Sequence, residues 1–500
     1  MHDLLPLLHG YLTNVFGSIP WFIPEINLAL LFIVVLITDL IFGKNSQSLC
    51  RIIAFAGVLL VAFRDYQQLP LLNINGEANG HFFFNQMLLL TPAAIKFKMI
   101  IDVLAFILIV YFEWDDKLSA HRKGLSDLYT IVIGSVFGLH LMTMAVNLLS
   151  IYLSIEMVSI ASYLMVAYRT ENMISTEAGL KYVLFGATAS AVMLYGISLL
   201  YAFTGSLSLF SENLLPGLLA VNPAAVSMAL ILVLAGIGFK LSFVPMQFWV
   251  PDVYEGAPTP VTAWLSTLPK IAAFALLINF LTPFIFFTNW TAFDFRMFFS
   301  VIGIATMIAG NFAAIFQNNV KRMLAYSSIG HTGFALMAIV TFTTNGISAL
   351  TYYLAVYGIA NIGALALTSY FSNEAGADDI ESYKGLGHKY HTASVCFVIL
   401  LVSLTGLPVT AGFTGKLFVF SAVYGVYAQH HNNWLLLLMV TGAVTTVVSL
   451  FYYIKIPLYL FLKRAEIDIN SIKNSKNILV LSIILSILII LVGLFPYLLF

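Results

Sequence analysis

The stretch LAGIGFKLSFVPMQFWVPD, residues 234–252, places a lysine inside a long apolar run. About 20 predominantly apolar residues are enough for a helix to cross a bilayer, and this run covers roughly residues 224–249. Gly236, Gly238 and Pro245 interrupt it, because glycine weakens a helix and proline removes a helical hydrogen bond. Irregular backbone at membrane depth is tolerated only inside protein or beside a water-filled cavity. The stretch therefore predicts a broken membrane helix that carries Lys240 at a working site.

The composition of the whole chain agrees with a membrane protein. Of 500 residues, 60% are hydrophobic and 9% are charged, against about 25% charged residues in an ordinary soluble domain. These values exclude a soluble globular enzyme and a disordered chain. The 23 basic residues balance the 23 acidic ones, so no net field attracts nucleic acid.

Motifs for cofactors are missing from the sequence. Cys50 and Cys396 are its two cysteines, whereas an iron–sulfur cluster takes about four. We find no dinucleotide-binding glycine motif, no Walker A loop and no Cys–His spacing for a metal. We therefore expect no cofactor in this chain.

Apolar runs of spanning length recur along the sequence, and they lack the period-two alternation of a transmembrane barrel. We predict an all-α polytopic membrane protein with about 14 transmembrane helices. The predicted spans are 23–43, 49–66, 96–114, 127–147, 149–168, 177–203, 224–249, 260–285, 297–316, 322–342, 346–371, 393–427, 434–460 and 477–498. The start of the chain does not resemble a cleaved signal peptide, so 23–43 is expected to be a retained span.

The distribution of lysine and arginine predicts the orientation. With the N-terminus outside, 14 of these residues fall in inside loops and five within spans. The outside loops hold four, namely Arg64, Lys96, Lys98 and Arg296. Because cytoplasmic loops carry the excess of positive residues, both termini are expected outside.

Four charged residues lie near the middle of predicted spans: Glu156, Lys240, Lys270 and Lys416. Each costs about 2.5–3.5 kcal/mol at the bilayer centre. A structural ion pair or a lysine reaching to the interface is the alternative for any one of them. Their neighbours are polar at helical spacing, as in Thr262–Ser266–Lys270 and Glu156–Ser159–Tyr163, and this favours a hydrated path inside the bundle.

Four further residues allow either a structural or a functional role. Lys181 lies close to the end of its span, so its side chain can reach the interface. Lys455 also lies near a helix end, and there a structural role is the better interpretation. His331 is central in 322–342 and is either a satisfied core histidine or a proton relay, and His140 is a weaker candidate.

A second broken span predicts an internal repeat. Residues 403–420, SLTGLPVTAGFTGKLFVF, contain Gly406, Pro408, Gly412 and Gly415 around Lys416. Lys240 and Lys416 lie on spans seven and twelve, an odd number apart, so the second unit enters from the opposite side. We therefore predict two inverted five-helix repeats. The expected domains are 1–126 (helices 1–3), 127–285 (helices 4–8), 297–460 (helices 9–13) and 461–500 (a loop and helix 14).

Buried lysines and glutamates suit proton transfer, because burial disfavours the charged form of both. A movable Glu–Lys pair would hold a proton when closed and release it when open. Moving one charge against 100 mV takes about 2.3 kcal/mol, and nothing in this chain supplies it. Transport must therefore be coupled to a partner or to another ion gradient.

Three motifs, 239–274, VKRMLAYSSIGHTGF (320–334) and GLPVTAGFTGKLFVF (406–420), resemble the antiporter-like subunits of respiratory complex I, the proton-pumping NADH-quinone oxidoreductase. Lys416 after GFTG is similar to the subunit N type (complex I subunit 2 family). The resemblance implies the antiporter-like fold, with fourteen helices in which helices 7 and 12 are broken.

The resemblance also implies roles for individual residues. Glu156 resembles the glutamate paired with Lys240, Lys270 the connecting lysine, and Lys416 the lysine facing the proton exit. Lys181 resembles a lysine that modulates Lys240, and His331 lies in a shared motif.

Partners and location follow from the same resemblance. Redox chemistry with FMN, iron–sulfur clusters and quinone would occur in partner subunits of the complex, and the location would be a bacterial inner membrane with periplasmic termini. A cation/proton antiporter subunit of the related multi-subunit family is the alternative function, and a purely structural scaffold is a third.

Overall fold

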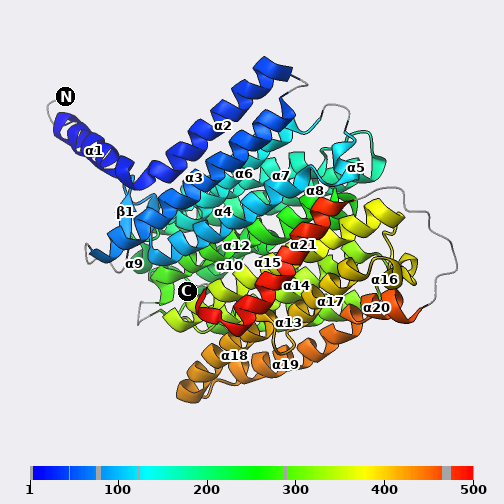
Figure 1. The fold of residues 1–500 in the computed structure, drawn as a ribbon. Helices are drawn as coiled ribbons and strands as arrows, with labels where there is room; N and C mark the ends of the chain where they lie inside the picture. Colours follow the sequence, from blue (N-terminus) through cyan, green and yellow to red (C-terminus); the bar gives the residue numbers. More distant parts are fainter. Residues whose placement is uncertain are drawn as a thin grey trace.

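Long helices run side by side through the molecule (Figure 1). This computed structural model describes residues 4–43, 46–74, 80–121, 124–285, 290–463 and 475–498. Among these residues, 11 helices are long and apolar enough to cross a membrane. The predicted spans outside that set are 96–114, 322–342 and 393–427. Helices cover all three, but the first carries Lys96, Lys98 and Asp102, the second carries the polar patch 327–332, and the third is split in two.

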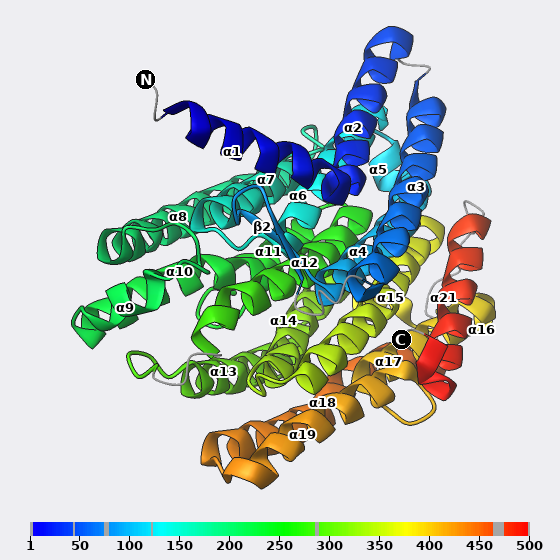
Figure 2. The same ribbon diagram turned by 90° about the vertical axis from the view of Figure 1, so that its left-hand side faces the viewer.

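The N-terminal part holds the first three predicted spans, and the predicted 23–43 is confirmed as helix α2. An additional helix, α1, precedes it and projects away from the bundle (Figures 1 and 2). The elements are α1 (Leu4–Ser18), η1 (Ile19–Phe22), α2 (Ile23–Phe42), α3 (Gln47–Ile74), β1 (His81–Phe83), β2 (Leu88–Leu90) and α4 (Pro92–Phe112). Strands β1 and β2 form an antiparallel hairpin that was not predicted.

The next segment covers predicted spans four to eight. Polar side chains cap α5, α7, α8 and α10. At the start of α7, Asn147 and Ser150 form a capping box, which satisfies backbone N–H groups that have no partner within the helix. The elements are α5 (Asp116–Ser119), α6 (Ser126–Met144), α7 (Leu148–Val166), α8 (Met173–Thr204), α9 (Leu214–Leu219), α10 (Pro223–Leu241), α11 (Trp249–Gly256) and α12 (Thr259–Ile285).

The remaining segment covers predicted spans nine to fourteen. Its elements are α13 (Phe295–Ile315), α14 (Val320–Ile339), α15 (Thr344–Ala375), η3 (Ile380–Tyr383), α16 (Leu386–Lys389), α17 (His391–Thr405), α18 (Ala411–His430), α19 (Asn433–Tyr453), α20 (Lys455–Pro457), η4 (Leu458–Leu462), α21 (Lys476–Leu494) and η5 (Pro496–Leu498). In the view of Figure 2, α8 and α10 lie on one side, α18 and α19 on another, and α12, α14 and α15 between them. Helices α12 and α15 are buried along most of their length.

Both predicted breaks are confirmed. Helix α10 ends at Leu241, Ser242 follows with φ 63°, and α11 begins at Trp249. Helix α17 ends at Thr405, and the chain passes through Gly406 (φ 85°) and Val409 (φ 77°) before α18 begins. Positive φ is accessible to glycine without steric cost, so Gly406 allows the chain to leave α17 at that point.

Contacts between loops confirm the predicted alternation of the helices. On one side, Lys117 pairs with Asp378 at 2.7 Å, and Asn319 bridges to Asp379. On the other side, Leu88 bridges to Ala145 and Asn147 to Ser208. Each pair was predicted on one side of the membrane. Five of the inside cations, Lys44, Arg122, Lys123, Arg464 and Lys473, lie outside the described residues.

All four cations assigned to outside loops lie within helices: Lys96 and Lys98 in α4, Arg296 in the first turn of α13, and Arg64 in α3. Arg64 lies within α3, which continues to Ile74 beyond the predicted end at 66. Lys98 lies within α4 and has an exposed fraction of 0%. These residues stand at or near the ends of the predicted spans 49–66, 96–114 and 297–316 and were counted with the adjacent loops. The assignment fails because each helix extends beyond its predicted end.

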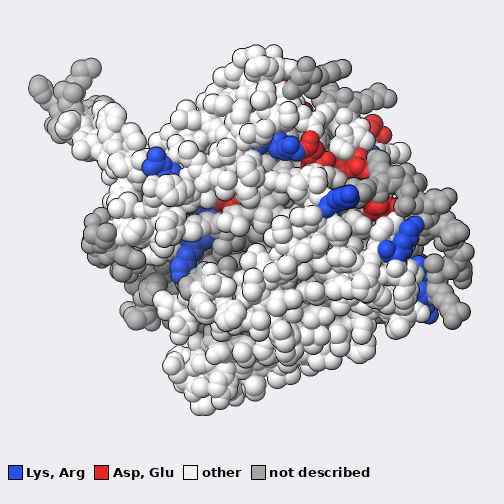
Figure 3. Space-filling model, in the orientation of Figure 1, with Lys and Arg blue, Asp and Glu red and all other residues white. Residues whose placement is uncertain are grey.

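The surface agrees with a lipid-facing bundle. In Figure 3, a broad area carries no charged side chains, and most of those in view gather toward the end where Figure 1 places α5 and α16. Many large apolar side chains are exposed on the outer helices, such as Leu40 at 75% and Phe63 at 58%. An apolar belt is what a bilayer requires, so the chain is a polytopic membrane protein.

Replacement of Gly412 by alanine is expected to destabilise the second break. A Cβ atom at Gly412 would overlap the carbonyl oxygen of Ser403, so α17 and α18 would have to separate. Overpacking of this kind costs about 1–3 kcal/mol. The thermal unfolding midpoint of the detergent-solubilised protein should fall.

Gly425→Ala, on the same helix, is the matched control, because nothing lies within 4 Å of its Cβ position. Its midpoint should stay the same or rise, since alanine favours the helix by about 1 kcal/mol. Equal midpoints for the two variants would contradict the close packing at the break.

Candidate functional site

Lys240 lies in the last turn of α10 and is 4% exposed. Its ammonium has no hydrogen-bond partner among the described residues. Instead, the rings of Tyr163, Tyr182 and Phe239 have their centroids 5.9, 5.7 and 5.9 Å from Nζ. Aromatic faces within about 6 Å attract a cation, and the carbonyl end of a helix does the same. Lys240 is therefore held by rings and a helix end rather than by a counter-ion.

Glu156 lies on α7 and is half-buried. Its Oε1 is buried without a hydrogen-bond partner, and no ion pair within 4.0 Å joins it to Lys240 in the described part of the chain. Tyr163, two turns further along the predicted polar face of α7, reaches the Lys240 ammonium with its ring. Glu156 and Tyr163 thus lie on the same face of α7 as the contact with Lys240, while the Glu156 carboxylate and the Lys240 ammonium form no ion pair in the described residues.

Lys270 lies on α12 and is hydrogen-bonded to α14. Its Nζ donates to the Ser328 hydroxyl at 2.7 Å, to the Ser328 carbonyl at 3.1 Å and to the Thr332 hydroxyl at 3.1 Å. Thr332 in turn donates to the carbonyl of Leu241 at 2.9 Å. Leu241 follows Lys240 directly, so this row of hydrogen bonds from Lys270 ends at the backbone next to Lys240, whose own ammonium takes no part in it.

Helix α15 adds hydroxyl and amide groups to this row. Tyr357 donates to the Ser328 hydroxyl at 2.9 Å, and Asn361 donates to the Ser266 hydroxyl at 2.6 Å. Tyr357 and Asn361 were not predicted. Tyr353, Tyr357 and Asn361 follow one another at i, i+4 and i+8, the spacing that indicates one helix face, so the sequence did contain a signal for them.

His331 lies between three tyrosines. Its Nδ1 is 2.7 Å from the Tyr353 hydroxyl and its Nε2 is 3.2 Å from the Tyr453 hydroxyl, while the Tyr357 ring packs 4.8 Å from the imidazole ring. The Tyr453 hydroxyl also contacts Ser327. His331 is therefore a satisfied buried histidine, and it also lies next to the row that begins at Lys270.

Lys416 lies on α18 beside the break. Its Nζ donates to the Thr405 carbonyl at 2.8 Å and to the Thr446 hydroxyl at 3.4 Å, and the Phe334 ring centroid is 4.7 Å away. Thr405 is the last residue of α17, whose final carbonyls have no partner within the helix. The break thus creates the acceptor that holds the Lys416 ammonium.

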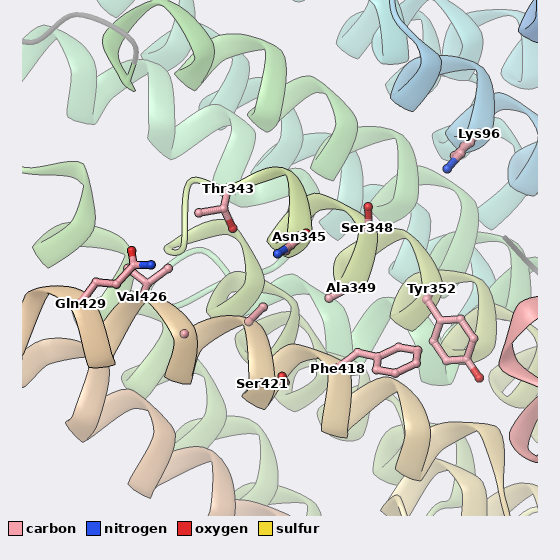
Figure 4. Close-up of a pocket in the computed structure, with 12 residues that line it drawn as sticks. Lys96, Thr343, Asn345, Ser348, Ala349, Tyr352, Phe418, Ser421, Val426 and Gln429 are labelled. Carbon is pink, nitrogen blue, oxygen red and sulfur yellow. The ribbon is translucent and has the colours of Figure 1, made fainter.

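A cavity of about 470 Å³ lies between α15, α18 and the start of α4. Figure 4 shows Thr343, Asn345, Ser348 and Gln429 along its walls, with Lys96 across from them. Phe418 and Ser421, which also line it, are on the helix that carries Lys416. The cavity therefore brings polar groups close to the helix that carries Lys416.

Lys181 lies apart from this row. Its Nζ is 3.0 Å from both Glu177 and Asp252, and its side chain is 39% exposed. Arg322 of α14 approaches Asp252 at 2.7 Å. Burial alone would raise the pKa of Asp252, but the hydrogen bonds from Arg322 and Lys181 lower it below its usual value. Asp252, just after the first break, thus joins α8, α11 and α14.

Comparisons with known proteins identify the family of the chain. The family model described as NADH:quinone oxidoreductase/Mrp antiporter, TM, matches residues 145–446. NADH-quinone oxidoreductase subunit N 2 of Chloroherpeton thalassium is 38% identical over 450 residues, which are 89% of this chain and 86% of that protein.

Two solved structures share the fold. A chain of respiratory complex I from Thermus thermophilus, solved with bound aureothin, superposes with a TM-score of 0.76 at 26% identity, over 95% of this chain and 97% of that one. A chain of the Mrp complex from Dietzia sp. DQ12-45-1b superposes with a TM-score of 0.76 at 18% identity, over 95% of both chains, and shows the fold alone. The chain therefore belongs to the NADH:quinone oxidoreductase/Mrp antiporter transmembrane family, within which it groups with subunit N of NADH-quinone oxidoreductase.

Proposed function

We propose that this chain is the subunit N component in the membrane arm of a proton-pumping NADH-quinone oxidoreductase. It takes part in proton translocation, which is driven by electron transfer from NADH to quinone in other subunits. The observation that carries the proposal is the buried row that links the Leu241 carbonyl, Thr332, Lys270, Ser328 and Tyr357 by hydrogen bonds. Buried groups of this kind in a membrane protein mark ion and proton pathways.

The row suits a proton because its hydroxyl members, Thr332, Ser328 and Tyr357, both donate and accept. Hydroxyl groups of serine, threonine and tyrosine carry one donor and two lone pairs, so each can pass a proton by rotation. Lys240 has no hydrogen-bond partner among the described residues, whereas Lys270 has three contacts. In our proposal a proton on Lys240 is the least tightly held, and it moves toward Lys270 when Glu156 and Lys240 separate.

The other end of the row is assigned to proton exit. Lys416 next to the second break receives the proton and delivers it toward the polar cavity along α18. His331 and its tyrosines lie between Lys270 and this end, and we assign them a relay role. Lys181 is given a modulating role through Asp252, because that pair joins α8 to the segment after the first break.

Cofactors, partners and location follow from the assignment. FMN, iron–sulfur clusters and quinone belong to partner subunits, and the neighbours of this chain are other antiporter-like and small membrane subunits of the complex. We place it in a bacterial inner membrane with both termini on the periplasmic side. Residues 127–285 and 297–460 are assigned as two inverted repeats, each with its break in the fourth helix, between domains 1–126 and 461–500.

The assignment is tested by a native gel of mild-detergent membranes with a tagged chain, stained for NADH dehydrogenase activity. The tag should run with a large complex that oxidises NADH. A smaller band without that activity would favour the second candidate, a cation/proton antiporter subunit, whose fold is shared. Sodium-dependent proton exchange in vesicles would then be the confirming assay for that alternative.

Lys240→Met and Lys270→Met are expected to abolish most proton pumping. Methionine keeps the length of the side chain but carries no proton, and a positioned proton-transfer group contributes about 10²–10⁴-fold to the rate. NADH-driven acidification of inverted vesicles should fall by at least about tenfold, and coupled NADH oxidation should fall with it.

Lys455→Met is the control, since Lys455 contacts the backbone carbonyl of Ile315 near a helix end. It should keep pumping close to wild type. Native gels establish that each variant assembles. Normal pumping by fully assembled Lys240→Met complex would contradict the proposed role of Lys240.

Glu156→Gln should also lower pumping strongly, whereas Glu156→Asp should retain a substantial part of it. The aspartate keeps a negative charge on the same face of α7, and no hydrogen bond of Oε1 is lost in either variant. The pumping rate per NADH oxidised separates the two. Equal rates for both variants would show that the charge of Glu156 is not needed.

A further inference from the structure

A second group of buried charges lies where α2, α3, α4 and α6 meet. It lies away from Lys240, Lys270 and Lys416, which we call the lysine row. It consists of five side chains that are each 0% exposed, and we name it the N-terminal charge cluster: Glu25, Asp65, Lys98, Asp102 and His140. All five lie outside residues 145–446, which the family model covers. The lysine row therefore does not account for this cluster.

The cluster is closely connected. Lys98 Nζ is 2.8 Å from Glu25 Oε1 and 2.6 Å from Asp65 Oδ1. His140 Nδ1 is 3.2 Å from Glu25 Oε1 and 3.9 Å from Asp65 Oδ2, and its Nε2 is 2.9 Å from Asp102 Oδ1. In the part of the chain that the structure describes, these five side chains form ion pairs only with one another.

The contacts of His140 set a minimum number of protons. Both ring nitrogens face a carboxylate oxygen, but a neutral imidazole donates from only one nitrogen. The other contact would join two lone pairs unless the ring or the facing carboxyl group carries an additional proton. The arrangement therefore holds one proton beyond those of Lys98, a neutral histidine and three carboxylates.

That first proton does not neutralise the cluster. Three carboxylates, one ammonium and the additional proton leave one net negative charge, fully buried among helices. Glu25 Oε2 and Asp102 Oδ2 are buried and have no hydrogen-bond partner among the described residues. An unpaired buried charge is costly, so the two oxygens offer places for one more positive ligand.

In the described ranges, no ion pair joins a further cation to the cluster. Gln68 of α3 donates to the Trp21 carbonyl, and Thr143 of α6 donates to the His140 carbonyl. Asn279 of α12, which also packs here, donates to the Thr143 carbonyl at 2.9 Å. Arg64, next to Asp65 in the chain, is exposed and donates to Gln67. These groups are neutral or face away, so neutralisation has to come from a bound ligand.

A metal ion fits less well than a proton. Ligand atoms of Glu25, Asp65 and His140 lie within 4.8 Å of one another, as a cation site requires. The Lys98 ammonium, however, already lies against both carboxylates, and a metal ion there would meet a positive charge at close range. A proton adds to a free carboxylate oxygen without displacing Lys98.

We propose that the N-terminal charge cluster is a proton-binding site, which holds one proton shared between His140 and the facing carboxylates and takes up a second on a carboxylate. The site is separate from the lysine row. The hairpin β1–β2 and the turn before α2 close over this end of the bundle, as Ser18 accepts a hydrogen bond from the Phe84 N–H at 3.0 Å. Bound protons are thereby shielded from bulk water.

Infrared spectroscopy of the purified complex tests the proposal. Wild-type complex should show a carboxylic acid C=O band of a buried group that shifts in D₂O and changes with pH. Glu25→Gln, Asp65→Asn or Asp102→Asn should abolish or shift this band, while Glu212→Gln, at an exposed acid, should leave it unchanged. A spectrum identical to wild type in all three cluster variants would overturn the proposal.

Two further measurements cover the remaining outcomes. If the neutral variants do not assemble, Glu25→Asp and Asp102→Glu keep an ionisable group, and at least one should shift the pH at which the band changes. An unchanged midpoint in both would overturn the proposal. A metal ion bound in equimolar amount to the wild-type complex and lost in Glu25→Asp would also overturn it, in favour of a cation site.

Discussion

A charge buried in a membrane-spanning bundle must find partners within the protein. This constraint explains the surroundings of both the buried lysines and the N-terminal charge cluster. Each such charge costs about 2.5–3.5 kcal/mol at the bilayer centre. Lys240, Lys270 and Lys416 meet the constraint in three ways: aromatic rings, hydroxyl groups of a neighbouring helix, and the carbonyl end of a broken helix. The strength with which each ammonium is held therefore differs along the row.

The two breaks have the same physical consequence at different lysines. A helix end leaves carbonyl groups without intrahelical partners and carries partial negative charge. Lys240 lies in the last turn of α10, and Lys416 donates to the last residue of α17. Glycine and proline thus do more than bend the chain, because they create helix ends whose carbonyl groups accept from side chains: Thr405 from Lys416 and Leu241 from Thr332.

Sequence reasoning succeeded for properties that depend only on neighbouring residues in the chain. The length of an apolar run and the presence of Gly406 or Pro245 are readable along the chain, so the spans and both breaks were predicted. It failed where partners come from distant segments. Lys98 was assigned to a loop because it stands near the start of a predicted span. Its partners, Glu25 and Asp65, could not be predicted because they lie on two other helices. The tyrosines of α15 were missed because aromatic residues in an apolar helix usually indicate core packing.

Helix α12 connects the two groups of buried charges. Near its middle, Lys270 bonds to Ser328 and Thr332 of α14, and two to three turns further along, Asn279 bonds to the backbone of α6 at Thr143. Thr143 is three residues after His140 and donates to its carbonyl. A displacement of α12 large enough to change the hydrogen bonds of Lys270 would therefore also strain the α6 backbone that positions His140. Because packed interiors transmit strain instead of absorbing it, the charge state at one end of α12 has a structural route to the other.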